Sequence, residues 1–168
     1  MDKVSFLTLL AALSSAACAS AQAAPAVVGA TVSVATAPVC RELGCRLLGN
    51  RIDRSGPSNP TNVSTYVLPQ GQRLEEVRLH LPGKPGHGQT VRLLYDRGTS
   101  AYGAVNAAKL ASGGAGRTVT AAQVRGCWNA GVTSAGSPHV ISQRGFNDPL
   151  VTCEVSGGRQ TVTVSIAL

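Results

Sequence analysis

The chain has 168 residues, 43% of them hydrophobic, and a formal net charge of +7 at pH 7. That length suffices for one ordinary domain with a real hydrophobic core. Aromatic residues make up only 4% of the chain, which argues against a nucleic-acid binder that stacks bases on rows of aromatic side chains.

The N-terminus has the pattern of a bacterial signal peptide. Lys3 precedes an apolar run over residues 4–13, and Ala21-Gln22-Ala23 forms a cleavage motif of small residues. The apolar run is too short for a membrane span, which takes about 20 residues. We therefore expect residues 1–23 to be removed and residues 24–168 to form an exported domain, periplasmic or extracellular.

Cys18 offers an alternative, because a lipid-modified cysteine becomes the first residue of a bacterial lipoprotein. Ala16 and Ala17 suit the lipidation motif, whereas Ser15 stands where that motif has an aliphatic residue. The rest of the chain contains no second apolar stretch that approaches the length of a span. The exported domain is therefore expected to be soluble or peripheral.

The first half of the exported domain is predicted to be mostly strand. Residues 24–38 are small and uncharged, and they can form either a strand or a tether below the cleavage site. Residues 53–62 are rich in turn formers and form a surface loop. A meander of three antiparallel strands is predicted over residues 63–68, 74–81 and 91–95.

The second strand of this meander alternates in polarity. Val77, Leu79 and Leu81 share one face, and Arg78 and His80 share the other. We expect the apolar face to point into the protein and the Arg78 face to point to solvent.

Two helices are predicted in the second half of the chain. Residues 99–111 are rich in alanine and precede a glycine stop at Gly113-Gly114. In the next helix, Thr120 and Gln123 have the spacing of a capping box, and Gly131 is expected to end the helix. Helical periodicity then puts three side chains on one buried face: Val124, Cys127 and Trp128.

A hairpin is predicted at the C-terminus. Leu150–Ser156 and Arg159–Leu168 flank Gly157-Gly158, a dipeptide suited to a two-residue turn. This turn sets the register, so that Cys153 lies opposite Val162 and the apolar side chains share one face.

Four of the five cysteines follow the signal peptide, an even number that predicts two disulfides in an oxidising compartment. Cys127 and Cys153 are both expected in the core and are predicted to be bonded. Cys40 and Cys45 then form a local bridge that needs a turn, which Gly44 can supply. Long-range pairings remain open, because four cysteines allow three connectivities. A four-cysteine zinc site is disfavoured, since Cys127 and Cys153 are too far apart in sequence to form a second ligand pair.

Catalytic and cofactor motifs are not found in the sequence. The chain lacks G-x-S-x-G and S-x-x-K, and bonded cysteines leave no thiol nucleophile. The three histidines, His80, His87 and His139, have too few carboxylates around them to indicate a metal site. We therefore expect no catalytic residue, metal or cofactor.

These observations predict a single α+β domain with an antiparallel sheet of five to seven strands and one or two short helices on one face. The expected function is that of a non-enzymatic exported protein, envelope-associated or extracellular, with a binding or structural role. The alternatives are a small secreted hydrolase and a weak, non-specific polyanion binder. Expected partners are anionic envelope polymers or another envelope protein, without specific nucleic-acid recognition.

Overall fold

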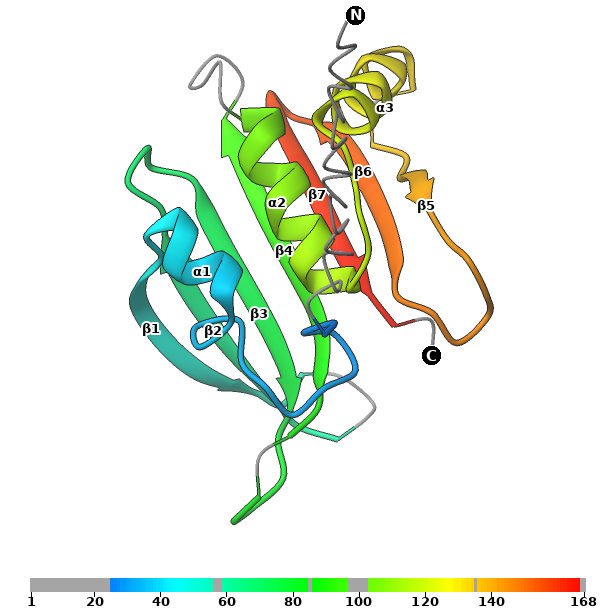
Figure 1. Cartoon of the computed structure of the whole chain (residues 1–168). Coiled ribbons are helices and arrows are strands. Elements are labelled where there is room, and N and C mark those ends of the chain that lie inside the picture. Colours follow the sequence, from blue (N-terminus) through cyan, green and yellow to red (C-terminus); the bar gives the residue numbers. More distant parts are fainter. Residues whose placement is uncertain (1–24, 56–58, 85, 97–102, 135, 167–168) are drawn as a thin grey trace, which may run out of the picture.

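The computed structural model describes residues 25–55, 59–84, 86–96, 103–134 and 136–166. Figure 1 shows one broad, twisted sheet with two helices on one side of it, α1 (Pro38–Leu43) and α2 (Gly103–Ala115). The predicted signal peptide, residues 1–23, lies outside the described residues. Within the described ranges no helix is long and apolar enough to cross a membrane.

The described strands form one antiparallel sheet of seven strands in the order β1-β2-β3-β4-β7-β6-β5. The strands are β1 (Arg46–Asp53), β2 (Thr61–Val67), β3 (Arg73–Leu79), β4 (Gly88–Asp96), β5 (His139–Ser142), β6 (Leu150–Ser156) and β7 (Arg159–Ser165). The predicted α+β class and strand number are confirmed, and so is the meander, which is β2-β3-β4. The edge strands β1 and β5 were not predicted.

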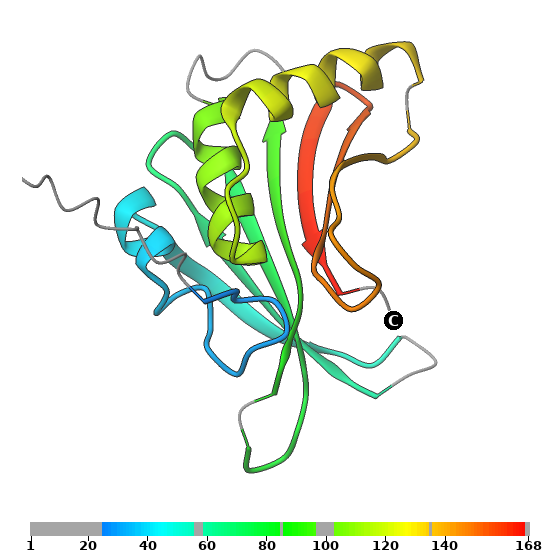
Figure 2. The same cartoon turned by 45° about the vertical axis from the view of Figure 1, so that its right-hand side comes forward.

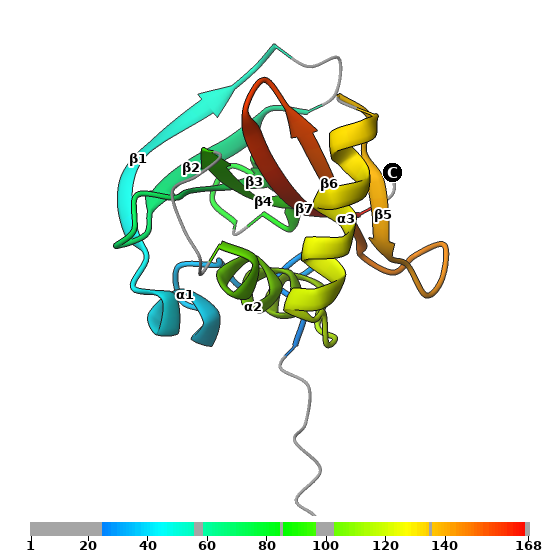
Figure 3. The same ribbon diagram turned by 90° about the horizontal axis from the view of Figure 1, so that it is seen from above.

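The helices are α1 (Pro38–Leu43), α2 (Gly103–Ala115) and α3 (Ala121–Thr133). α2 contacts β4, β7 and β6, and α3 contacts β6 and β5, so the helices share one face of the sheet (Figures 2 and 3). We call this the inner face. In the described part of the chain, no helix lies on the opposite, outer face.

A row of side chains on the inner face forms the centre of the core. It crosses β3, β4, β7 and β6 as Leu74, Leu93, Val162 and Cys153. The exposed fraction of each of these side chains is 0 or 1%. Burying one leucine or valine side chain stabilises a fold by about 1.5–3 kcal/mol, so this row contributes much of the stability.

The predicted C-terminal hairpin is confirmed in strands, turn and register. Cys153 lies opposite Val162, and Val151 lies opposite Val164. Gly157 and Gly158 form the turn with φ values of 54° and 78°. Both residues therefore adopt the left-handed conformation that a primed two-residue turn requires.

The predicted capping box of α3 is also confirmed. The Thr120 side chain accepts a hydrogen bond from the backbone N–H of Gln123, and the Gln123 side chain accepts from the backbone N–H of Thr120. The predicted end at Gly131 is wrong, because α3 continues to Thr133. Gly131 is instead a packing residue, since a Cβ there would approach Val155 to 3.0 Å.

The predicted stop of α2 at Gly113-Gly114 is wrong for a similar reason. The helix runs through both glycines, and the left-handed residue that follows it is Gly116, with φ of 64°. A Cβ on Gly113 would lie 2.9 Å from Val39, and one on Gly114 would lie 3.1 Å from Val164. These glycines let α2 approach its neighbours closely.

Residues 25–37 form neither of the predicted alternatives, an extended strand or a tether. They cross the inner face as an irregular segment, which we call the N-terminal segment, and its buried side chains are Val27, Val28, Val34 and Ala37. Val27 N–H donates to Gly113 O at 3.2 Å, and Gly29 N–H donates to Gly88 O at 2.8 Å. The segment is thereby joined both to α2 and to β4.

The predicted orientation of β3 is wrong as well. Its inner face carries Leu74, Glu76 and Arg78, whose exposed fractions are 0, 0 and 9%. Val77 and Leu79 lie half-buried on the outer face. The charged residues turn inward because the N-terminal segment supplies their hydrogen-bond partners, a contact between distant parts of the chain that polarity alternation does not show.

Candidate functional site

The outer face of β1 to β4 carries four exposed arginines. Residues directly opposite one another in the sheet share a face, so the register places these side chains. Arg46 and Arg73 flank Val67 from the two neighbouring strands. Arg51 lies opposite Val63, which itself pairs with Val77. We call Arg46, Arg51, Arg73 and Arg92 the outer arginines.

The outer arginines have no ion-pair partner among the described residues. The ion pairs between described side chains are Arg78–Glu76 and Lys109–Glu42, and both lie elsewhere. Among the described side chains of β1 to β4, two carboxylates share the outer face: Glu75 opposite Arg92 and Asp53 at the end of β1. Hydrogen bonds from Ser55, together with the charge of Arg51, lower the pKa of Asp53 from its usual 3.8. Over β1 to β4, four guanidinium groups against two carboxylates among the described side chains leave the outer face with an excess of positive charge.

A polar hollow lies at the start of β3, beside the turn that joins β2 to β3. Its volume is about 510 Å³. The lining residues are Gln70, Gly71, Gln72, Arg73, Glu75, Leu94 and Arg159. The turn is closed by hydrogen bonds from Gly71 N–H to Leu68 O and from Leu68 N–H to Gln72 O, both 2.9 Å. Asn106 of α2 donates to the Gln70 side chain at 3.3 Å and supports the turn from the inner face.

Gln72 is an unusual member of this lining. Its exposed fraction is 3%, and neither its Nε2 nor its Oε1 has a hydrogen-bond partner among the described residues. Leaving a buried amide group unpaired costs about 1–3 kcal/mol. Most buried polar side chains are paired for this reason, so Gln72 requires an explanation.

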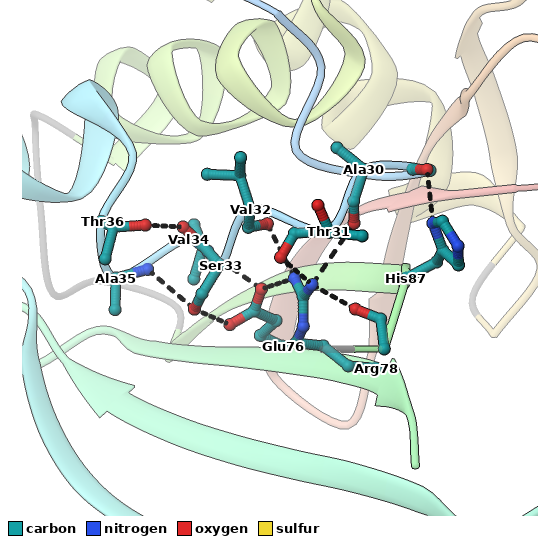
Figure 4. Close-up of polar contacts among 12 residues, drawn as sticks. Ala30, Thr31, Val32, Ser33, Val34, Ala35, Thr36, Glu76, Arg78 and His87 are labelled. Atoms are coloured by element: carbon teal, nitrogen blue, oxygen red, sulfur yellow. Dashed lines mark hydrogen bonds and ion pairs between the residues drawn. The ribbon is translucent and has the colours of Figure 1, made fainter. Parts of the chain in front are cut away.

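The Glu76–Arg78 pair on the inner face fastens the N-terminal segment to the sheet (Figure 4). Arg78 Nη1 donates to Glu76 Oε1 at 2.9 Å and to Val32 O at 2.7 Å. Glu76 also accepts from Ser33 Oγ at 2.7 Å and from Val34 N–H at 2.9 Å. Because every partner is part of the fold, we assign this pair a structural role.

Tyr66 completes the polar cluster around Glu76. Its hydroxyl donates to Glu76 Oε2 at 3.3 Å. Burial raises the pKa of Tyr66 above its usual 10.0; a hydrogen bond with Ser33 opposes this rise and the negative charge of Glu76 adds to it. The tyrosine is therefore held in its neutral form.

The four cysteines that the sequence singled out lie in two pairs. Cys127 and Cys153 have an S–S distance of 2.00 Å and join α3 to β6. Cys40 and Cys45 have an S–S distance of 2.12 Å, and the chain turns between them at Gly44 with φ of 67°. Both pairs are those expected from the sequence, and neither leaves a thiol for chemistry.

The three histidines lie apart. His80 Nδ1 is 3.1 Å from Asn62 Oδ1, and His87 Nδ1 is 3.2 Å from Gly29 O. Across the described ranges, no group of three histidine, cysteine or acidic side chains is arranged to hold a metal ion.

His139 is the histidine with a hydroxyl partner. Ser134 Oγ lies 2.6 Å from His139 Nε2, at the end of α3. In serine hydrolases the nucleophilic serine and the histidine base make such a contact, and a carboxylate orients the histidine. No carboxylate is hydrogen-bonded to His139 within the described residues, and neither residue lines the polar hollow.

Sequence reasoning missed the outer arginines and Gln72. The arginines are spread over β1, β3 and β4, so only the strand register brings them together. The alternation of Arg73, Glu75 and Val77 was the available signal, but Val77 was expected on the inner face. No protein-family model, curated protein or solved structure matches the chain.

Proposed function

We propose that the chain is a non-enzymatic, exported binding protein of a bacterial envelope, and that it adheres to anionic polymers through the outer arginines. The observation that carries the proposal is the exposure of Arg46, Arg51, Arg73 and Arg92 on a face of the sheet that no described helix covers. Guanidinium groups donate paired hydrogen bonds to carboxylate, sulfate and phosphate groups. The two disulfides and the signal-like N-terminus support export, because such bonds persist in oxidising compartments.

The arrangement suits adhesion better than it suits recognition of a nucleic-acid sequence. The outer face presents valine and threonine between its arginines, for example Val67 between Arg46 and Arg73. The register places neither a tyrosine nor a tryptophan among the outer arginines, although such rings are the usual platforms for bases. Binding should therefore depend on charge and on salt.

The proposal is tested on the natural protein recovered from its envelope fraction. N-terminal sequencing should begin at Ala24, and retention on heparin should fall steeply as the NaCl concentration rises. Retention that is independent of salt would contradict the electrostatic proposal. A lipid-bearing start at Cys18 would instead make the protein membrane-anchored.

A small hydrolase is the second candidate, and the contact between Ser134 and His139 is the observation that favours it. If this pair is catalytic, a fluorophosphonate probe should label Ser134, and Ser134→Ala should abolish both labelling and ester hydrolysis. If Ser134 only closes the end of α3, the probe leaves the chain unlabelled.

A further inference from the structure

β1 lies at one edge of the sheet, and among the described strands it pairs with β2 alone (Figure 3). One row of its backbone N–H and C=O groups therefore has no partner among the described strands. Three large apolar side chains of β1 are also exposed: Leu47, Leu48 and Ile52 have exposed fractions of 50, 53 and 43%. A long edge strand with exposed apolar side chains is a ready site for pairing with another strand.

A β-bulge decides which side chains of β1 share a face. The register against β2 shifts after Leu47, so Leu48 is an extra residue in β1. Arg46 and Asp53 consequently share the outer face. Leu47 and Ile52 share the inner face. In a regular strand the members of each pair would lie on opposite faces, because side chains alternate.

These positions make β1 complementary to a second copy of itself. In an antiparallel pair of β1 strands related by a two-fold axis, residue i meets residue j and residue j meets residue i. When Arg46 lies opposite Asp53 of the second copy, Leu47 lies opposite Ile52. Opposite charges then meet on the outer face and apolar side chains meet on the inner face, and both are favourable cross-strand pairs.

Neighbouring registers of the same pairing lack this match. A shift of two residues in one direction places Arg46 opposite Arg51, and like charges directly opposite each other destabilise a sheet. The reverse shift places Leu48 opposite Asp53 and removes the ion pair. The charges and the apolar side chains therefore favour the same single register.

We propose that β1 joins two copies of the chain into a dimer with one continuous sheet. This inference goes beyond the proposed function and does not depend on it. Because residues opposite one another share a face, the outer faces of the two copies are continuous across the dimer. A long polyanion can then contact the outer arginines of both copies at once, which strengthens binding without a new kind of contact.

Sedimentation equilibrium of the exported protein, without any polyanion, measures the dissociation constant of this dimer. The wild type should associate as the protein concentration rises and stop at the mass of two chains, because a two-fold interface is closed. Arg46→Asp and Asp53→Arg each replace two symmetric attractive pairs by repulsive ones, so each should raise the dissociation constant about tenfold. The double variant Arg46→Asp/Asp53→Arg restores opposite charges and should dimerise within about threefold of the wild type.

Ile52→Lys tests the apolar contact on the inner face. A lysine there would lie opposite Leu47 of the second copy, so the dissociation constant should rise about tenfold. Val132→Lys is the control, because Val132 is exposed on α3, and it should dimerise like the wild type. None of the substituted side chains is buried, so the unfolding midpoint of each monomer should stay close to that of the wild type.

Other outcomes would overturn the dimer. A wild type that stays monomeric at every concentration would leave the edge of β1 to a strand of another protein. A dimer that Arg46→Asp weakens and the double charge reversal does not restore would have a different register from the one proposed. If the dimer forms as expected while heparin retention is independent of salt, the proposed function fails and the dimer stands.

Discussion

Arg78 Nη1 lies 2.9 Å from Glu76 Oε1, and both side chains are buried between β3 and the N-terminal segment. Removing one partner of a buried ion pair leaves an uncompensated charge, at a cost of about 3–5 kcal/mol. We therefore expect Glu76→Ala to reduce the free energy of unfolding by about that amount in a denaturant titration. Glu42→Gln should change it by less than about 1 kcal/mol, because the Glu42–Lys109 pair is exposed.

The double variant Glu76→Leu/Arg78→Met separates two contributions to stability: the cost of an unpaired buried charge and the loss of the hydrogen bonds that Arg78 makes. It removes both buried charges, so it should recover part of the stability that Glu76→Ala loses. A double variant less stable than Glu76→Ala would show that the hydrogen bonds of Arg78 to the N-terminal segment matter more than its pairing with Glu76.

Tyr66 should make stability depend on pH in the alkaline range. Burial raises the pKa of Tyr66 above 10.0, so the folded protein keeps the proton at pH values where the unfolded chain has lost it. This stabilising contribution is complete below about pH 10 and is lost as the pH rises through the pKa of the folded state. In Tyr66→Phe, the unfolding midpoint should fall less steeply with pH above 10; an unchanged slope would show that Tyr66 does not titrate differently on folding.

The two disulfides should differ in their effect on stability. The bond between Cys127 and Cys153 closes a loop with a sequence separation of 26, against 5 for Cys40 and Cys45. On the chain-entropy account, the longer loop is worth about 3.5 kcal/mol and the shorter one about 2 kcal/mol. Peptide mapping without reduction should recover the Cys127 and Cys153 peptides joined.

Replacing each cysteine pair by alanine measures this difference directly. The Cys127→Ala/Cys153→Ala variant should unfold at a lower denaturant concentration than the Cys40→Ala/Cys45→Ala variant. A Cys127 peptide joined to that of Cys40 or Cys45 would rule out the packing of α3 on β6 described above.

Variants in the turn of the C-terminal hairpin measure the cost of backbone strain without any change in side-chain packing. Gly158 has φ of 78°, and a Cβ there would meet nothing within 4 Å. Gly158→Val should therefore lose stability only through backbone strain, about 1–2 kcal/mol. Gly157→Asn should be nearly neutral, because Asn-Gly suits the same turn. Equal losses in the two variants would mean that the turn is not of the primed type.

Local sequence signals predicted the elements whose contacts are local. The capping box at Thr120 and the glycine pair at 157–158 each act within a few residues, and both are confirmed. The hairpin register followed from the turn, so Cys153 could be assigned to the core before any tertiary contact was known.

Features that depend on distant contacts were not predictable in this way. Glu76 and Arg78 are buried because the N-terminal segment, more than 40 residues earlier, supplies their partners. Gly113 and Gly131 looked like helix stops, but they permit close packing against Val39 and Val155. The outer arginines become one surface only through the pairing of β1 to β4.

Adhesion through the outer arginines is tested most directly by two variants of equal charge. Arg46→Gln/Arg51→Gln/Arg92→Gln removes three outer arginines and leaves Arg73 in the polar hollow. Arg41→Gln/Arg125→Gln/Arg144→Gln removes three exposed arginines that lie outside β1 to β4.

The measurement is the dependence of dextran sulfate affinity on the logarithm of NaCl concentration, for which each lost contact should reduce the slope by roughly 0.7. The outer-arginine variant should lose about two units of slope and most of its affinity, while the control should keep a slope close to that of the wild type. Equal losses in the two variants would contradict a localised binding face and leave only the overall charge of the chain.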